Sequence, residues 1–131
     1  MSALAQMKLL INLAQIDGSV AEREQNYIVN IGRANGIYPD EIRPLFNQTH
    51  DNLIPDNLAR DEKFKYIFSL VQLMKIDERM YKEEILFCSS VATKLGYAKE
   101  AMFELLLHVR PGGMSDAELK HLQSLTEKHL K

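Results

Sequence analysis

The chain repeats itself after sixty residues, and this internal repeat restricts its fold more than any other feature. When the sequence is shifted by sixty positions and compared with itself, the register holds without a gap from Leu10 to Tyr97. The identical pairs are Leu10 and Leu70, Leu13 and Leu73, Ile16 and Ile76, Asp17 and Asp77, Glu24 and Glu84, and Gly36 and Gly96. The pattern predicts two copies of one supersecondary unit, a pair rather than a solenoid array.

The first helix of each copy is predicted from apolar residues that occupy most of a helical wheel. From Leu4 to Ile16 they leave only a narrow polar strip of Lys8, Asn12 and Gln15. Its counterpart, about Asp61 to Ile76, repeats the arrangement with Lys65, Ser69, Gln72 and Lys75 along one side. Because so wide an apolar surface must be covered on more than one side, we expect these two helices at the centre of the core.

Turn and capping residues predict the second helix. Asp17-Gly18 ends the first helix, and Ser19-x-x-Glu22 reads as a capping box that starts a helix running to about Asn35. Gly36 then supplies a left-handed C-terminal stop, and Gly96 stops the matching helix of the second copy. In that copy Glu78 replaces the glycine of the turn.

The rest of the chain completes an all-helical architecture. We expect a short third helix from Pro39 to about Asn47, a longer copy of it at 98–109, and a final amphipathic helix at about 115–130 with Leu119, Leu122, Leu125 and Leu130. No stretch has the period of a strand. The predicted fold is a single all-α domain, residues 1–131, forming a bundle of about seven helices. It comprises two tandem three-helix repeats (about 4–47 and 61–109) related by pseudo-twofold symmetry, a connector at 48–60 and the C-terminal helix.

Charge and cysteine content exclude some classes of function. With 16 Lys and Arg against 18 Asp and Glu, the chain has no positive excess to neutralise phosphates, so we do not expect nucleic acid as a partner. The first apolar run is interrupted by Asn12 and Gln15, which argues against a signal peptide or membrane span. A single cysteine, Cys88, fits a reducing compartment, and we expect a cytoplasmic protein.

Four acidic residues carry the main chemical signal. On a wheel of the second helix, Glu24 lies in the middle of an apolar face, and Glu84 repeats this in the other copy. A carboxylate there needs a compensating partner, because an unpaired buried charge costs several kcal/mol. Asp17 and Asp77, in the preceding turns, can reach the same neighbourhood. These four oxygen ligands predict a site for a hard divalent ion: calcium, magnesium or manganese.

A structural explanation of the same residues stays open. Each aspartate could accept backbone amides at a helix start, and each glutamate could form an ion pair with a nearby basic residue. The candidate bases are Arg23, Lys75, Arg79 and Lys82. Ion-pair networks of this kind resemble functional acid clusters, so spacing alone does not decide between the two.

The repeated turn resembles the motif of the tellurite-resistance TerB-like domains, which are all-helical proteins built from two such repeats. In that motif an apolar helix ends in Asp-Gly, and a Glu follows seven residues after the Asp, as in Ile16-Asp17-Gly18 through Glu24. The segment from Ile76-Asp77 through Glu84 matches apart from the glycine. The resemblance implies divalent-metal ligands at Asp17, Glu24, Asp77 and Glu84. Domains of this family occur in stress-response and membrane-associated assemblies and in a DnaJ-like co-chaperone, so the resemblance implies a role of that kind.

Other chemistry-bearing residues favour ordinary structural roles. Glu118-x-x-His121 lacks the second pair and the extra glutamates of a di-iron site, and Cys88 reads as a small core residue. His50, His108 and His129 have no partner at catalytic or metal spacing. Asp17-Gly18 lacks the ligand pattern of an EF-hand, and no catalytic motif or phosphate-binding loop is present.

The function expected from the sequence is therefore a non-enzymatic domain that binds a divalent cation. It would act as an accessory or interaction module in a stress response, with a protein partner and no organic cofactor or membrane insertion. Two alternatives stay open: a metal-free helical scaffold for protein interaction, and a metal-dependent enzyme.

Overall fold

The computed structural model describes residues 2–16, 20–48, 50, 54–55, 57–76 and 82–130. Throughout these ranges the regular structure is helical: seven α-helices and one 3₁₀ helix occur, and no strand is formed. The predictions of an all-α fold and of seven helices are confirmed. The chain divides into two compact units, Met1–Asn57 and Leu58–Lys131, and the boundary falls in the predicted connector.

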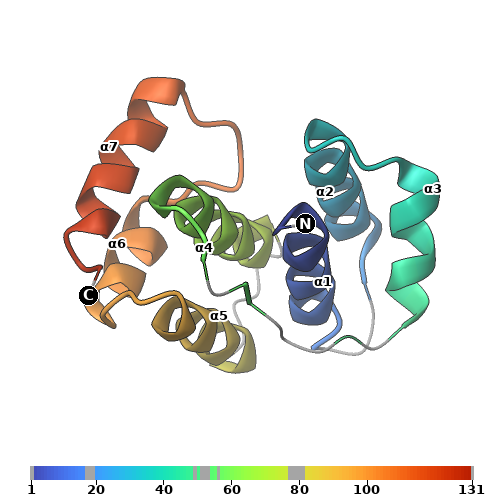
Figure 1. Ribbon diagram of the computed structural model, residues 1–131, viewed down its shortest axis with the longest axis horizontal. Coiled ribbons are helices and arrows are strands. Elements are labelled where there is room, and N and C mark those ends of the chain that lie inside the picture. Colours follow the sequence, from blue (N-terminus) through green and yellow to red (C-terminus); the bar gives the residue numbers. More distant parts are fainter. Residues whose placement is uncertain are drawn as a thin grey trace. The chain divides into compact units, whose positions relative to one another are not determined.

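The first unit contains three α-helices and a 3₁₀ helix: α1 (Ser2–Ala14), α2 (Glu22–Ala34), α3 (Pro39–Ile42) and η1 (Arg43–Asn47). Within the unit, α1 packs against α2 and η1, and α2 packs against α3 (Figure 1). The approach of α2 to α3 is close at Gly32, where an added Cβ would lie 2.1 Å from Cδ1 of Ile42. A glycine at this helix position therefore makes room for the fully buried Ile42.

The second unit contains α4 (Arg60–Ile76), α5 (Lys82–Lys94), α6 (Glu100–His108) and α7 (Asp116–Glu127). In this unit α4 packs against each of the other three helices, and α6 also packs against α5 and α7 (Figure 1). The start of α7 follows the sequence prediction. The Ser115 hydroxyl accepts the Glu118 N–H at 3.2 Å, and the Glu118 carboxylate accepts the Ser115 N–H at 3.0 Å, which completes a capping box.

The first helix of each copy is the most deeply buried element of its unit, as predicted. In α1 the side chains of Met7, Leu10 and Ile11 have no exposed surface. In α4 the apolar side chains from Phe64 to Met74 are buried with few exceptions. Since burial of such side chains contributes roughly 1.5–3 kcal/mol each, these two helices supply much of the stabilising apolar surface.

Both copies end their second helix with the same turn. Gly36 has φ of 82° and Gly96 has φ of 97°, values that strain any residue with a side chain. The N–H of Ile37 donates to Gly32 at 2.9 Å, and the N–H of Tyr97, sixty residues later, donates to Ala92 at 3.0 Å. The N–H groups of the two glycines donate to Arg33 and Thr93, three residues earlier, and the two pairs of bonds form Schellman motifs at equivalent positions.

The polar strip on the first helix of each copy binds backbone carbonyls in the last turn of η1 or α6, or just after it. In the first unit, Asn12 donates to the His50 carbonyl at 2.9 Å and Gln15 to the Phe46 carbonyl at 2.7 Å. In the second unit, Gln72 donates to the Arg110 carbonyl at 3.0 Å. Lys75 there donates to two carbonyls, those of Leu106 and of Val109, the latter at 2.6 Å. Donors and acceptors again differ by sixty positions.

Several predicted helix boundaries are wrong. The helix α2 begins at Glu22 rather than at Ser19, which lies outside the described residues. The single helix predicted over 39–47 is α3 followed by η1, because Pro44 has no N–H to continue an α-helical ladder. The final helix ends at Glu127, so Leu130 is not part of its apolar face but forms an isolated bridge with Tyr97.

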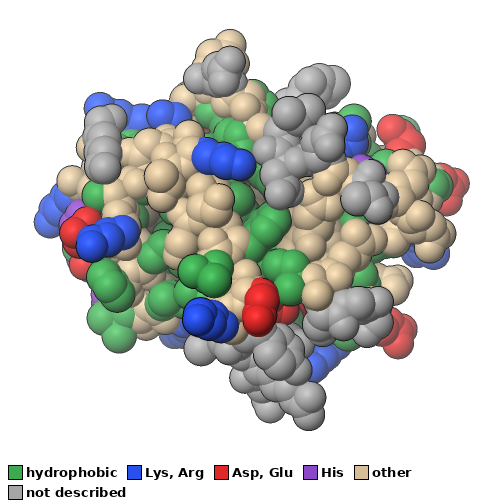
Figure 2. Space-filling model, turned by 90° about the horizontal axis from the view of Figure 1, so that it is seen from below, with side chains coloured by type: hydrophobic (Ala, Val, Ile, Leu, Met, Phe, Trp, Pro, Cys, Tyr) green, Lys and Arg blue, Asp and Glu red, His purple; other side chains and the backbone are tan. Residues whose placement is uncertain are grey.

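None of the helices in the described ranges is long and apolar enough to cross a bilayer. Figure 2 shows one face of the protein, where Lys and Arg side chains and Asp and Glu side chains both occur among apolar ones. Neither sign of charge covers this face, in keeping with a formal net charge of −2.

Candidate functional site

Glu24 is buried in the first turn of α2. Only 6% of its surface is exposed, although glutamate is among the side chains that are rarely buried. Ile28 and Gly32 are the other buried residues of α2, so a stripe at four-residue spacing begins with a carboxylate. The prediction that Glu24 lies in the apolar face of this helix is confirmed.

The backbone at the start of α2 stabilises this carboxylate. Glu24 is the third residue of the helix, and its Oε1 accepts the N–H of Ala21 at 3.3 Å. The positive end of the helix dipole also favours a negative charge there. The predicted capping pair of Ser19 and Glu22 is wrong in this respect, because Glu24 supplies the carboxylate that returns to the backbone at the helix start.

Glu84 has the same place in the second unit. It is the third residue of α5 and is 3% exposed, with Cys88 and Val91 among the buried residues that follow on the same helix. Burial, together with the negative charge of Glu84, raises the pKa of the Cys88 thiol to about 12. Since the thiolate is the reactive form, Cys88 is an inert core residue, as the sequence predicted.

The two aspartates of the predicted site, Asp17 and Asp77, lie outside the described residues. The convergence of Asp17, Glu24, Asp77 and Glu84 therefore stays a prediction. The described half of the set fits a hard cation in its chemistry, because both glutamates offer only oxygen ligands and both are withdrawn from bulk water. Glu24 already uses one oxygen at the helix start, which a bound ion would have to share or displace.

Among the described residues, no three or more His, Cys, Asp and Glu side chains gather closely enough to hold a metal ion. Glu118, His50 and His108 have structural contacts instead. Glu118 caps α7 and forms an ion pair with Arg110, and His121 on the next turn is exposed. The ring of His50 contacts the Leu45 carbonyl at 2.9 Å, and His108 lies 3.6 Å from Glu104 on the same exposed helix surface.

The proposed ion pair between Lys75 and a glutamate has a competitor in the structure. The Lys75 ammonium donates to the Leu106 and Val109 carbonyls at the end of α6. Sequence reasoning identified Asn12, Gln15, Gln72 and Lys75 as a polar strip but missed this role. The sequence does contain a sign of this role, because both copies have hydrogen-bond donor side chains at these equivalent positions.

Comparisons with protein-family models, with curated proteins and with solved structures gave no significant match. The class defined by the fold alone is that of an all-α protein with buried acidic residues at two helix starts. The resemblance to TerB-like domains is a prediction that rests on the repeated turn.

Proposed function

We propose that this protein is a non-enzymatic helical domain that binds a divalent cation through its acidic turns and serves as an accessory or interaction module. A cytoplasmic, tellurite-type stress response is the setting that the TerB-like motif suggests. The domain would consist of two tandem three-helix repeats with pseudo-twofold symmetry. The shared sixty-residue spacing of the Schellman turns and of the carbonyl-binding side chains supports duplication.

The observation that carries the proposal is the burial of Glu24 and Glu84 at identical positions of α2 and α5. Withdrawal of a carboxylate from water costs free energy that a cation bound by oxygen ligands would offset. Helix capping alone does not require burial, because the N–H groups at helix starts are also accessible from the surface. Calcium, magnesium and manganese are the ions whose ligand preference matches carboxylate oxygens.

A metal-free scaffold for protein interaction is the second candidate. It is favoured by the hydrogen bond from the Ala21 N–H to Glu24, which gives this carboxylate a structural role without any ion. On this explanation the acids fix the angle at which each second helix starts, and the function lies on the outer surface.

Calorimetric titration of the full chain with calcium, magnesium and manganese chloride separates these two candidates. We expect heat of binding with at least one ion and a higher melting temperature, since an ion that binds only the folded state stabilises it, by about 2.7 kcal/mol at a hundredfold excess over Kd. Glu24→Gln and Glu84→Gln keep the side-chain shape and remove the charge. Each should strongly weaken the ion-dependent stabilisation.

Glu62→Gln is the matched control. Glu62 is also the third residue of its helix and accepts the Ala59 N–H at the same 3.3 Å, but it lies outside the repeated acidic motif. Its variant should keep the full response to the ion. The absence of any heat and of any shift in melting temperature up to millimolar ion would leave the scaffold as the preferred function.

A further inference from the structure

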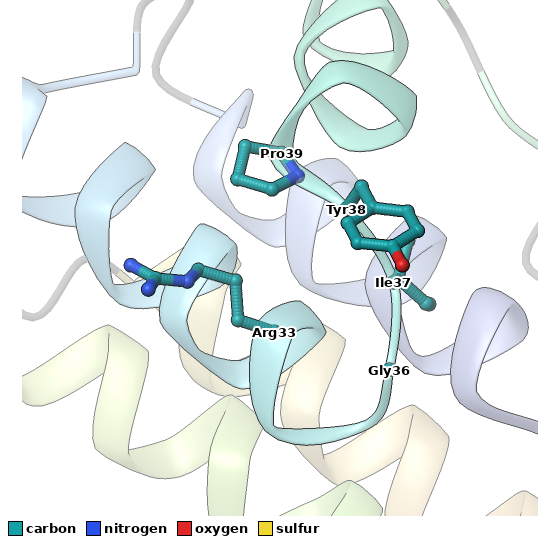
Figure 3. Close-up of a pocket in the computed structure, with 5 residues that line it drawn as sticks. All are labelled: Arg33, Gly36, Ile37, Tyr38 and Pro39. Carbon is teal, nitrogen blue, oxygen red and sulfur yellow. The ribbon is translucent and has the colours of Figure 1, made fainter.

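A shallow depression lies at the opposite end of α2 from Glu24. Its volume is about 410 Å³, and Arg33, Gly36, Ile37, Tyr38 and Pro39 line it. Figure 3 shows the Gly36–Tyr38 segment running from the end of α2 to the start of α3, with the side chains of Arg33 and Pro39 projecting to one side of it. The lining is mostly apolar, with one guanidinium group.

This turn exposes an aromatic ring, a backbone N–H and a guanidinium group that could each contact a partner. Tyr38 is a large aromatic residue with 72% of its surface exposed. Its backbone N–H has no hydrogen-bond partner within the described ranges. No described carboxylate forms an ion pair with the exposed Arg33. Beyond the chain neighbours of Gly36, no heavy atom of the described residues lies within 4 Å of a Cβ added there, so this part of the lining is open.

The equivalent turn of the second unit is covered by the chain itself. There the N–H of Ala98 donates to the His129 carbonyl at 2.6 Å, and Tyr97 forms an antiparallel bridge with Leu130. Tyr97 is only 1% exposed. The turn that follows α7, residues 128–130, thus pairs with the backbone of this turn.

The two turns have the same backbone hydrogen bonds apart from this pairing. Both are Schellman motifs. In both, an N–H of the following helix donates to a carbonyl of the turn: Glu41 to Tyr38 at 2.9 Å, and Ala101 to Ala98 at 3.0 Å. The N–H of Tyr38 therefore occupies the position of the Ala98 N–H. It is a preformed donor for a backbone carbonyl of another segment.

We propose that the turn Gly36–Tyr38 binds an acidic segment of a partner polypeptide. A carbonyl of that segment accepts the Tyr38 N–H, as His129 does for Ala98. An apolar side chain of the segment lies against Ile37 and Pro39, in the role that Leu130 has beside Tyr97. An Asp or Glu of the segment pairs with Arg33, which replaces the neutral Thr93 of the second copy.

Charge complementarity favours a partner protein over a second copy of this chain. The segment that covers the second turn contains Lys128 and His129, and Lys131 follows. Such a basic segment would face Arg33 with charge of the same sign. This binding surface goes beyond the proposed function, and it does not involve the acidic turns.

The test is selection of random decapeptides displayed on phage against the immobilised full chain. We expect enrichment of peptides that carry Leu, Ile or Val next to Asp or Glu. A selected peptide, made synthetically, should bind Arg33→Ala roughly tenfold more weakly, the effect expected for loss of one charge-assisted hydrogen bond. Arg23→Ala, which changes an exposed arginine at the other end of α2, should leave the affinity unchanged.

Tyr38→Pro tests the backbone contact. Tyr38 has φ of −76° and ψ of 146°, values that proline adopts, so this change removes the N–H at little conformational cost. We expect Tyr38→Pro to abolish peptide binding while Tyr38→Ala, which keeps the N–H, retains part of it. Unchanged helical circular dichroism and melting temperature would verify that the proline variant is folded.

Three results would overturn the proposal. The first is a selection that gives no acidic-apolar consensus, and the second is a selected peptide that binds Tyr38→Pro as well as the unmodified chain. The third is self-association of the unmodified chain, measured by sedimentation, that the Tyr38→Pro variant does not show, because a second copy would then be the occupant. Since divalent titration of Glu24→Gln uses different residues, failure of either test leaves the other interpretable.

Discussion

Single residues explain why two carboxylates tolerate burial in this protein. Glu24 and Glu84 both stand third in their helices, where free backbone N–H groups and the helix dipole favour negative charge. The sequence predicted their apolar surroundings from helical periodicity. It could not predict which residue caps α2, because Ser19-x-x-Glu22 and Ala21-x-x-Glu24 are overlapping candidates and capping preferences rank serine above alanine.

A buried hydroxyl gives the first prediction, at Tyr97. Its phenolic oxygen is buried without a hydrogen-bond partner among the described groups. A polar group in that state costs free energy on folding, whereas a phenyl ring would fill the same space. Tyr97→Phe should therefore stabilise the protein by roughly 1 kcal/mol, as measured by urea unfolding at pH 7.

The exposed Tyr38 provides the matched control for that measurement. Tyr38→Phe should change the free energy of unfolding by less than about 0.5 kcal/mol. Destabilisation by Tyr97→Phe would mean that the Tyr97 hydroxyl has a partner, such as an ordered water molecule, and that the physical argument is wrong.

At the scale of elements, the polar strip on the first helix of each copy contacts the end of η1 in the first unit and of α6 in the second. Gln15 binds the Phe46 carbonyl in the first unit, and Lys75 binds the Leu106 carbonyl in the second. The apolar pattern predicted the helices and also predicted that α1 and α4 are the most buried of them. The partners of the polar strip could not be predicted, because they depend on tertiary contacts between residues more than thirty positions apart.

The second prediction concerns the contact between Lys75 and the end of α6. Lys75→Met keeps the length of the side chain and removes both hydrogen bonds, so we expect a loss of about 2 kcal/mol in the free energy of unfolding. Lys75→Gln should lose about half as much, since Gln15 makes one such bond in the first unit. Urea denaturation measures both effects.

Hydrogen exchange gives the location of this effect. In Lys75→Met the amides near Leu106 and Val109 should exchange faster, because the end of α6 opens more readily. Lys120→Met, at an exposed position on α7, is the control and should leave both stability and exchange nearly unchanged. Equal effects of the two substitutions would show that Lys75 does not hold α6.

At the scale of the whole molecule, the sequence predicted the class of fold but only half of the candidate site can be located. Periodicity and the repeat are local signals, which is why helix number and burial were predicted correctly. The acidic site depends on two turns whose aspartates, Asp17 and Asp77, lie outside the described residues. The depression at Gly36–Tyr38 was missed, since its identification required a comparison of backbone contacts in the two units.

Alkaline pH should destabilise the protein, because folding keeps buried tyrosine hydroxyls and the Cys88 thiol protonated. Burial raises the pKa of Tyr27 in the first unit, and burial with the charge of Glu127 raises that of Tyr97 in the second. The pKa of Cys88 rises from 9.0 to about 12. A folded-state pKa above the unfolded one means that this stability is complete below the unfolded pKa and is lost as pH rises towards the folded pKa.

The last prediction follows for Cys88, whose window runs from about pH 9 to about pH 12. In the unfolded chain its thiol ionises freely at pH 10, which should remove on the order of 1 kcal/mol from the free energy of unfolding relative to pH 8. Cys88→Ala lowers stability at both values because it leaves a small cavity, but it has no thiol to ionise. The stability difference between the unmodified protein and Cys88→Ala should therefore shrink between pH 8 and pH 10, as measured by urea unfolding at each pH. A difference that stays constant over this range would show that the thiol ionises in the folded protein as readily as in the unfolded chain, contrary to its burial beside Glu84.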